Sequence, residues 1–325
     1  MMGAMGAEPS TDIADLLALV SDVDGARAAY HVRDDRGLAM DTIKVIEDGT
    51  GGYLGIYHTG NGRGFDVHLA TSTDLLTWRH RALLDAEASQ PTIAALPHGG
   101  FLTAVEAGGS GGPAWLRLRR YPSLRRLLAA EPDDTFDAPH TLTPRRRLAE
   151  GTPNIYPGDS PSTVDVGFHY LRRRRLWRGG VDRQARGELR DFRHWSTRYE
   201  RGVDAAVAAH GVAGNIGGRD FFTWRGRPYS LVEGQLRRKR WESWRVFLYD
   251  WSTGAAHPVP VRTRAGSVSF GNPTLTMLTA PSGEPAMVVT LYLFPAGAAP
   301  GEAGPLLYYR IVDGWTPSGS DTTGA

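Results

Sequence analysis

The sequence predicts an all-β protein, specifically a five-bladed β-propeller with a short helical extension at its N-terminus. Three observations support this fold. One stretch of the chain has the pattern of four short strands, its opening pattern recurs five times, and the composition favours turns. The chain of 325 residues contains 40 Gly and 21 Pro, and 10% of its residues are aromatic. Such a composition is typical of many short strands joined by tight turns.

The stretch from Asp41 to Trp78 predicts one blade. The expected strands are 42–46, 53–58 and 65–71, with 72–78 leading to a fourth. Each is short, rich in apolar residues and bounded by Gly, Asp or Ser. Asp41 stands directly before the first strand, so we expect its carboxylate at the mouth of a central channel.

The opening of this blade recurs along the chain. The similar segments are 40–59, 89–107, 150–170, 214–234 and 270–292, spaced by roughly 50 to 65 residues, as four strands and their loops require. Pro91, Pro153 and Pro273 occupy the same place, which we interpret as the residue before each strand, where a ladder hydrogen bond can be forgone. Five copies predict five blades. A two-sheet sandwich is the alternative fold, but it does not predict a fivefold repeat.

The flanking segments complete the predicted domain organisation. Ser10 or Thr11 is a candidate cap for an amphipathic helix at 11–20, and a strand fragment at 30–32 is expected to close the ring by joining the last blade. Residues 199–213 predict an inserted helix. The expected divisions are an extension at 1–28, a propeller at 29–313 and a tail at 314–325.

Composition and charge narrow the possible functions. The net charge is only +2, so the molecule as a whole does not match nucleic acid electrostatically. The Arg172–Arg175 and Arg237–Arg240 runs are interpreted as solvated hairpin tips. The chain has no Cys, and its His residues lack ligand spacing, so we predict no metal and no cofactor. No segment has the pattern of a signal peptide or a membrane span. We therefore expect a cytoplasmic protein that binds neither nucleic acid nor membrane, with its oligomeric state left open.

One phrase of the first blade carries a resemblance to a known family. LATSTDLLTW at 69–78, together with the strand-opening pattern of each blade, resembles the five-bladed propeller glycosidases of glycoside hydrolase family 43 and relatives such as family 32. The resemblance covers roughly residues 38–312. It implies a propeller that cleaves glycosidic bonds in its central pocket.

The same resemblance implies which residues do the chemistry. Asp41 matches the family's general base, although Thr42 stands where the family has Pro. Glu150 matches its general acid, but the motif Glu150-Gly151-Thr152-Pro153 carries one extra residue. The family's second-blade carboxylate is replaced by Thr92. Some relatives hold an axial ion with a fourth-blade His, which 214–220 lacks.

Glycoside cleavage requires two carboxyl groups across one bond, one protonated and one ionised. Asp41 and Glu150 are the predicted pair, and Glu106 or Glu233 is a candidate for the missing second-blade carboxylate. The structural alternatives are that Asp41 caps a turn and that Glu150 is a solvated loop residue. Residues near the starts of inner strands, with one tryptophan, are predicted to bind substrate: Gln90, Thr92, Asn154, Arg219, Asp220, Asn272 and Trp224. Arg219 with Asp220 is equally consistent with an internal ion pair.

These observations predict a glycoside hydrolase-like enzyme acting on a small-molecule or oligosaccharide substrate. Two alternatives remain open. One is an intracellular cyclase or lyase that reuses the propeller pocket, which the missing second-blade carboxylate favours. The other is a propeller that binds carbohydrate without catalysis. Fold resemblance alone does not choose among them.

Overall fold

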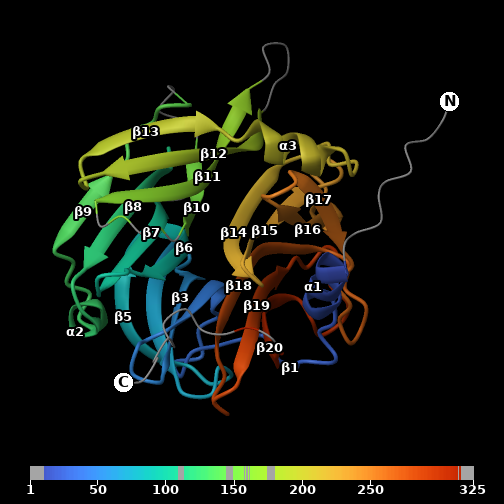
Figure 1. Ribbon diagram of the computed structural model, residues 1–325, viewed down its shortest axis with the longest axis horizontal. Helices are drawn as coiled ribbons and strands as arrows, with labels where there is room; N and C mark the ends of the chain where they lie inside the picture. The colour runs from blue at the N-terminus through green and yellow to red at the C-terminus, as the bar shows by residue number, and fades with distance from the viewer. Residues whose placement is uncertain are drawn as a thin grey trace.

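The protein is a five-bladed β-propeller, as the sequence predicts (Figure 1). The computed structural model describes residues 11–313, apart from 109–112, 144–148, 157, 159, 161 and 174–179, together with Trp315. Five four-stranded antiparallel sheets surround one axis, and each inner strand lies beside the inner strands of its two neighbours.

In blades one to four the strands follow the chain from the axis outward, whereas the outermost strand of blade five comes from the N-terminus. Blade one contains β2 (Asp41–Glu47), β3 (Tyr53–Gly60), β4 (Phe65–Ser72) and β5 (Arg79–Asp85). Blade two contains β6 (Ala88–Ala95), β7 (Phe101–Ala107), β8 (Trp115–Tyr121) and β9 (Asp134–Asp137). Blade three contains β10 (Glu150–Tyr156), β11 (Thr163–Arg173), β12 (Gly180–Arg190) and β13 (His194–Tyr199). Blade four contains β14 (Ile216–Trp224), β15 (Arg227–Gln235), β16 (Trp244–Asp250) and β17 (Ala255–Val259). Blade five contains β18 (Phe270–Thr279), β19 (Pro285–Leu293), β20 (Gly304–Ile311) and the N-terminal strand β1 (Arg27–Tyr30).

The N-terminal strand closes the ring. β1 pairs with β20 in antiparallel register, with Arg27 opposite Tyr309 and Tyr30 opposite Leu306. The predicted closing strand at 30–32 therefore exists, three residues earlier in the chain. Because the last blade contains strands from both ends of the chain, closure leaves no open edge between the first and last blades.

The chain also contains a few short helices in addition to the five sheets. The N-terminal helix α1 (Thr11–Ser21) confirms the predicted extension and buries Ile13, Leu16 and Val20. The predicted inserted helix is α3 (Arg201–Ala208), shorter than expected, and α2 (Leu124–Leu128) and the 3-10 turn η1 (Trp241–Ser243) were not predicted. The predicted tails at 1–10 and 314–325 lie outside the described residues apart from Trp315, as do Arg174 and Arg175. None of the described helices is long and apolar enough to cross a membrane.

The core lies between neighbouring blades, and the aromatic end of the LATSTDLLTW phrase belongs to it. Trp78 is 3% exposed and packs over Gly55 of β3, where an added Cβ would lie 2.8 Å from the indole. Asp74 holds the preceding turn by accepting hydrogen bonds from the backbone amides of Leu76 and Thr77. The segment 69–78 therefore forms the turn that leads to the outer strand, and its tryptophan packs against the sheet of the same blade.

Every inner strand contains a β-bulge near its start, as shown by register shifts between residues 41 and 44, 89 and 92, 151 and 154, 216 and 219, and 271 and 274. Pro91, Pro153 and Pro273 lie in these bulges, which corrects the expectation that they precede the strands. A bulge suits Pro because one of its residues is left out of the ladder. The non-glycine residues at the first bulge position have φ of 53°, 52°, 50° and 48°: Thr42, Gln90, Thr152 and Asn272. Such strained backbone collects at functional sites.

Candidate active site

All five inner strands begin at the same end of the axis, which we call the mouth, and Asp41 is the first residue of β2. It pairs with His58 just before the bulge. The side chain is half-buried, and its Oδ1 is buried without a hydrogen-bond partner. Burial raises the pKa of Asp41 to about 6, opposed by the positive charge of Arg33. Asp41 is thus a carboxyl group at the mouth that can carry or lose a proton near neutral pH.

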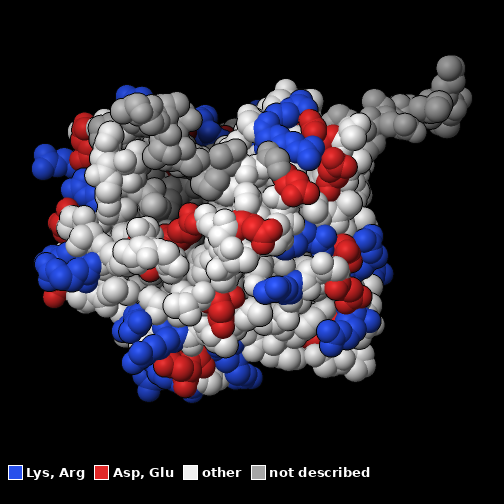
Figure 2. Space-filling view, turned by 60° about the horizontal axis from the view of Figure 1, so that its bottom comes forward, with Lys and Arg blue, Asp and Glu red and all other residues white. Residues whose placement is uncertain are grey.

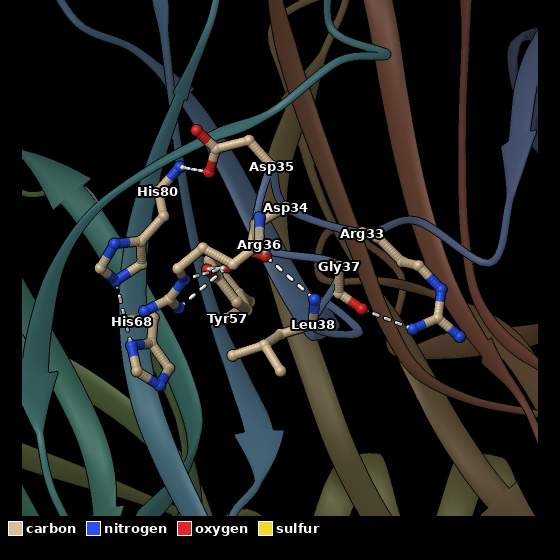
Figure 3. A network of polar contacts seen from close by, with 9 residues as sticks. All are labelled: Arg33, Asp34, Asp35, Arg36, Gly37, Leu38, Tyr57, His68 and His80. Carbon is tan, nitrogen blue, oxygen red and sulfur yellow. Dashed lines mark hydrogen bonds and ion pairs between the residues drawn. The ribbon is translucent and has the colours of Figure 1, made fainter.

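The segment that leads to Asp41 is anchored by a second carboxylate (Figure 3). Asp34 is buried and accepts hydrogen bonds from the Tyr57 hydroxyl at 2.7 Å and from the Leu38 amide at 3.0 Å. Its Oδ2 also lies 2.9 Å from Arg36 Nη2. Burial opposes ionisation of Asp34, but these bonds and the Arg36 charge outweigh it and lower its pKa. The loop that leads to Asp41 is therefore held by a carboxylate whose ionised form the surrounding bonds favour.

Glu150 lies at the start of β10, but its side chain is engaged by hydrogen bonds from a neighbouring loop. It is buried, and its Oε1 accepts hydrogen bonds from the backbone amides of Thr141, Leu142 and Thr143 at 3.1, 2.7 and 2.7 Å. The Thr143 hydroxyl donates a fourth bond at 3.0 Å. These contacts order the loop 141–143.

The register explains this position. Gly151, opposite His169, is the counterpart of Asp41, opposite His58, so Glu150 lies one residue earlier. Successive side chains of a strand point to opposite faces. The extra residue in the blade-three motif therefore shifts Glu150 away from the position that Asp41 occupies. Its assignment as the acid stays a prediction.

Two other carboxylates occupy the mouth in the places that glycines leave open. A Cβ on Gly151 would lie 2.0 Å from Glu106 Oε2, and a Cβ on Gly271 would lie 2.7 Å from Glu233 Oε2. Gly271 is the blade-five counterpart of Asp41. Glu106 and Glu233 come from the second strands of blades two and four, so they reach the mouth positions of the blades that follow. Burial raises the pKa of Glu233, against hydrogen bonds from the amides of Asn272 and Gly218.

A repeated hydrogen bond links the blades at this level. The amide of the bulge residue donates to a side chain on the second strand of the preceding blade. Gln90 donates to His58 Nδ1 at 3.0 Å, Thr152 to Glu106 at 3.0 Å, and Asn272 to Glu233 at 2.6 Å. Burial lowers the pKa of His58 to about 3, which keeps the ring neutral and its Nδ1 an acceptor. Gln90 and Asn272 thus lie at the mouth, and their role in substrate binding stays a prediction.

The interior of the axis is filled by an ion pair that crosses between blades. Lys44 Nζ lies 2.5 Å from Asp220 Oδ2 and donates to the Leu275 carbonyl at 3.0 Å. Asp220 also accepts from the Leu275 amide at 2.8 Å and from Asn154 Nδ2 at 2.9 Å. Sequence reasoning did not identify Lys44. Its signal is a lysine inside an otherwise apolar inner strand, which requires a buried partner.

Arg219 and Asp220 do not form the ion pair considered from the sequence. The Arg219 guanidinium lies between blades three and four, where Nη2 donates to the Ala185 carbonyl at 2.8 Å. It also lies 5.6 Å from the centre of the Tyr156 ring. Neighbouring residues on β14 point to opposite faces, so Asp220 turns to the axis and Arg219 to the blade interface.

Trp224 is placed differently from the prediction. It is 1% exposed, lies at the end of β14 remote from the mouth, and packs in the core with α1. Thr92 and Asn154 are also buried, one step deeper along the axis than the bulge residues. A core indole cannot stack on a substrate at the mouth, so the expectation for Trp224 is corrected here.

A cavity of about 250 Å³ opens at the opposite end of the axis, between blades two and three. Its walls are mainly apolar, and Asp191 is the sole acid among its described lining residues. Across the part of the chain that the structure describes, no group of three His, Asp or Glu is placed to hold a metal ion. Among the lining residues that are described, the cavity therefore lacks the neighbouring carboxyls that the mouth contains.

Comparison with solved structures shows which proteins share this fold. A thermostable family-43 glycoside hydrolase superposes with a TM-score of 0.52 and 13% identity, over 84% of this chain and 88% of that chain. An α-L-arabinanase mutant from Cellvibrio cellulosa gives 0.54 and 12%, over 86% and 92%. A further glycoside hydrolase gives 0.59 and 11%, over 93% and 97%. No protein-family model matches the chain, and no curated protein matches its sequence. The chain thus has the propeller fold of family-43 glycoside hydrolases.

Proposed function

We propose that this protein is a glycoside hydrolase-like enzyme that cleaves a glycosidic bond at the mouth, with Asp41 as one catalytic carboxyl. The observation that carries the proposal is the state of Asp41: half-buried at the mouth, with an unpartnered Oδ1 and a pKa raised to about 6. Hydrolases of this fold supply the reaction class as an analogy. Above pH 6 Asp41 is ionised and acts as base or nucleophile.

The second carboxyl is assigned to Glu106 in preference to Glu150. Glycoside cleavage needs a carboxyl that faces the first across the bond. Glu150 is occupied by the loop 141–143, whereas the Glu106 carboxylate projects at the blade-three counterpart of Asp41. Glu106 is half-buried and accepts a bond from the Thr152 amide, which fixes its position. Gln90 and Asn272 flank the same space from blades two and five.

The assignment is tested with Asp41→Asn, Glu106→Gln and Glu150→Gln, each assayed on aryl glycosides and on a panel of oligosaccharides. Loss of an acid or base typically costs about 10²–10⁴ in rate. We expect losses of that size for the first two variants and a smaller one for Glu150→Gln. Wild-type turnover by folded Asp41→Asn would overturn the proposal. Inactivity of Glu150→Gln alone would restore Glu150 as the acid.

A carbohydrate-binding protein without catalysis is the second candidate. Two observations favour it: Glu150 is engaged in loop contacts, and the Lys44–Asp220 pair fills the axis beneath the mouth. The same assay separates the two functions. A wild-type protein that binds glycans in calorimetry but cleaves none of the panel supports binding alone, and cleavage that depends on Asp41 excludes it.

A further inference from the structure

The loop between β15 and β16 stands at the mouth and presents an aromatic side chain to solvent. β15 reaches Glu233 at the mouth two residues before it ends at Gln235, so residues 236–243 rise from the mouth face. Trp241 in this loop is 57% exposed. Its backbone carbonyl accepts a hydrogen bond from Ser269 Oγ at 2.5 Å, which ties the loop to the connection before blade five. The indole is therefore exposed and also held in place.

Trp241 continues into a cluster of aromatic rings that leads towards Asp41. The centres of the Trp241 and Phe294 rings are 5.1 Å apart, and those of Phe294 and Tyr292 are 5.4 Å apart. The pKa of Tyr292 is raised by burial and then by the negative charge of Asp41, so the phenol lies within electrostatic range of that carboxyl. A Cβ on Gly271 would lie 2.5 Å from the Phe294 ring. The rings thus extend from solvent to the carboxylates of the mouth.

A run of four basic residues directly precedes the exposed ring in the chain. Residues 237–240 are Arg, Arg, Lys and Arg, directly before Trp241. Arg237 lies 3.4 Å from Glu242, and Arg238 donates to the Gly180 carbonyl at 2.8 Å. Among the described residues, the exposed side chains of Lys239 and Arg240 have no acidic partner within ion-pair distance.

Arg245, the second residue of β16, adds a further positive side chain directly after the loop. Burial and then the neighbouring charge of Arg237 lower the pKa of Arg245. We define the platform as Trp241 with Lys239 and Arg240: an exposed ring, and the two residues before it in the chain, which are exposed cations without an acidic partner among the described residues.

We propose that this platform binds a sugar unit bearing a carboxylate, so that the substrate is an anionic, uronate-containing oligosaccharide. The sugar stacks on the Trp241 ring through its C–H face, and its carboxylate pairs with Lys239 or Arg240. The inference rests on the proposed function, because it assigns the substrate class of the same site. Unpaired cations beside an exposed indole recognise an anion with an apolar face, and a uronic acid has both features.

Nucleic acid also combines negative charge with flat rings that can stack, but it fits the charge distribution of this molecule less well. A nucleic-acid surface requires a continuous basic field that neutralises many phosphates. On the face shown in Figure 2, basic and acidic side chains are interspersed among neutral ones, and the net charge is only +2. A local basic loop on a nearly neutral molecule matches one or two carboxylates better than a polyanion.

The test measures binding by calorimetry in the full-length Asp41→Asn protein, so that turnover does not interfere. The probes are trisaccharides of glucuronate or galacturonate and their neutral glucose or galactose counterparts. We expect the uronates to bind at least about tenfold more tightly, the change that about 1.4 kcal/mol produces. Their affinity should fall as salt rises, because the paired charges are exposed.

Two variants and two controls locate the contact. Trp241→Ala should weaken both classes of probe, and the Lys239→Gln/Arg240→Gln pair should weaken only the uronates. Tyr199→Ala removes an exposed ring on the outer strand of blade three, and Arg79→Gln/Arg125→Gln removes the same charge elsewhere. Both controls should bind as the parent does.

Equal affinity for charged and neutral probes, or parental binding by both loop variants, would overturn the inference. So would tight binding of single-stranded nucleic acid without uronate binding. The outcomes separate this inference from the proposed function. If the protein cleaves neutral glycans and the cleavage depends on Asp41, the proposed function is supported and the proposal of an anionic substrate is contradicted. If the wild-type protein binds uronates through this loop but cleaves no glycan, the platform is supported and the proposed hydrolysis is contradicted.

Discussion

Asp41 and Asp220 are both aspartates on inner strands, and burial raises the pKa of both, yet their surroundings differ. Asp220 lies within the axis and is paired with Lys44, the Leu275 amide and Asn154. Asp41 lies at the mouth, and its buried Oδ1 has no partner. The buried charge inside the axis is compensated by the protein, whereas the one at the mouth is left for a ligand. The combination of an unpartnered carboxyl oxygen, a raised pKa and a place at the mouth, rather than burial alone, marks Asp41 as part of the candidate active site.

The largest expected effect comes from breaking the compensated site. Lys44→Met leaves Asp220 buried without its counter-charge, which typically costs about 3–5 kcal/mol. We expect a loss of that size in the free energy of unfolding, measured by urea denaturation. Lys239→Met changes the only other lysine of the chain, which is exposed, and should change stability by less than about 0.5 kcal/mol. Equal midpoints for the two variants would show that the axial pair contributes nothing.

If the main role of Glu150 is to hold the loop 141–143, it is a structural carboxylate like Asp220, with its partners supplied by the protein. Glu150→Ala removes the acceptor of four hydrogen bonds and should cost about 2–3 kcal/mol of stability. Glu150→Gln keeps an acceptor and should cost about 1 kcal/mol. Both are measured by urea denaturation alongside turnover. If the Glu150→Gln protein has nearly normal stability but no activity, Glu150 is a candidate catalytic carboxyl like Asp41.

A further expected effect is confined to one range of pH and concerns the pH dependence of stability. A carboxyl whose pKa is raised in the folded state binds its proton more tightly there, so the contribution of Asp41 to wild-type stability falls as pH rises from about 4 to about 6. Asp41→Asn removes this loss and should be more stable than the wild type by about 1–3 kcal/mol above pH 6. The two proteins should be equally stable near pH 4. Asp24→Asn, which changes an exposed acid, should follow the wild-type curve across this range, and an identical curve for Asp41→Asn would contradict the raised pKa.

The architecture could be predicted from local signals. Turn residues and the fivefold recurrence of a short pattern were enough to place the blades, because each blade repeats the same packing problem. Asp41 was correctly placed at the start of an inner strand for the same reason. These features depend on spacing along the chain, which a sequence displays directly.

The directions of the other side chains could not be predicted, because they depend on the bulges, on the exact register of each strand and on contacts between blades. A bulge inserts one residue and so reverses which face each following side chain occupies. In blade three the extra residue of the motif puts Gly151, and not Glu150, at the counterpart of Asp41. The alternation of neighbouring residues along β14 sends Arg219 and Asp220 to opposite faces. Glu106 reaches the mouth of the next blade only because Gly151 leaves space there, a contact between blades that spacing along one strand does not reveal.

The protonation of Asp41 tests the central claim most directly. Carbon-13 NMR of aspartate side-chain carboxyls can follow each titration in the folded protein, and comparison with Asp41→Asn assigns the resonance. We predict a carboxyl that titrates near pH 6 in the wild type and is absent from the variant. If the resonance that disappears in Asp41→Asn titrates below pH 4, Asp41 is an ordinary ionised side chain, and the mouth lacks the carboxyl on which the proposed chemistry depends.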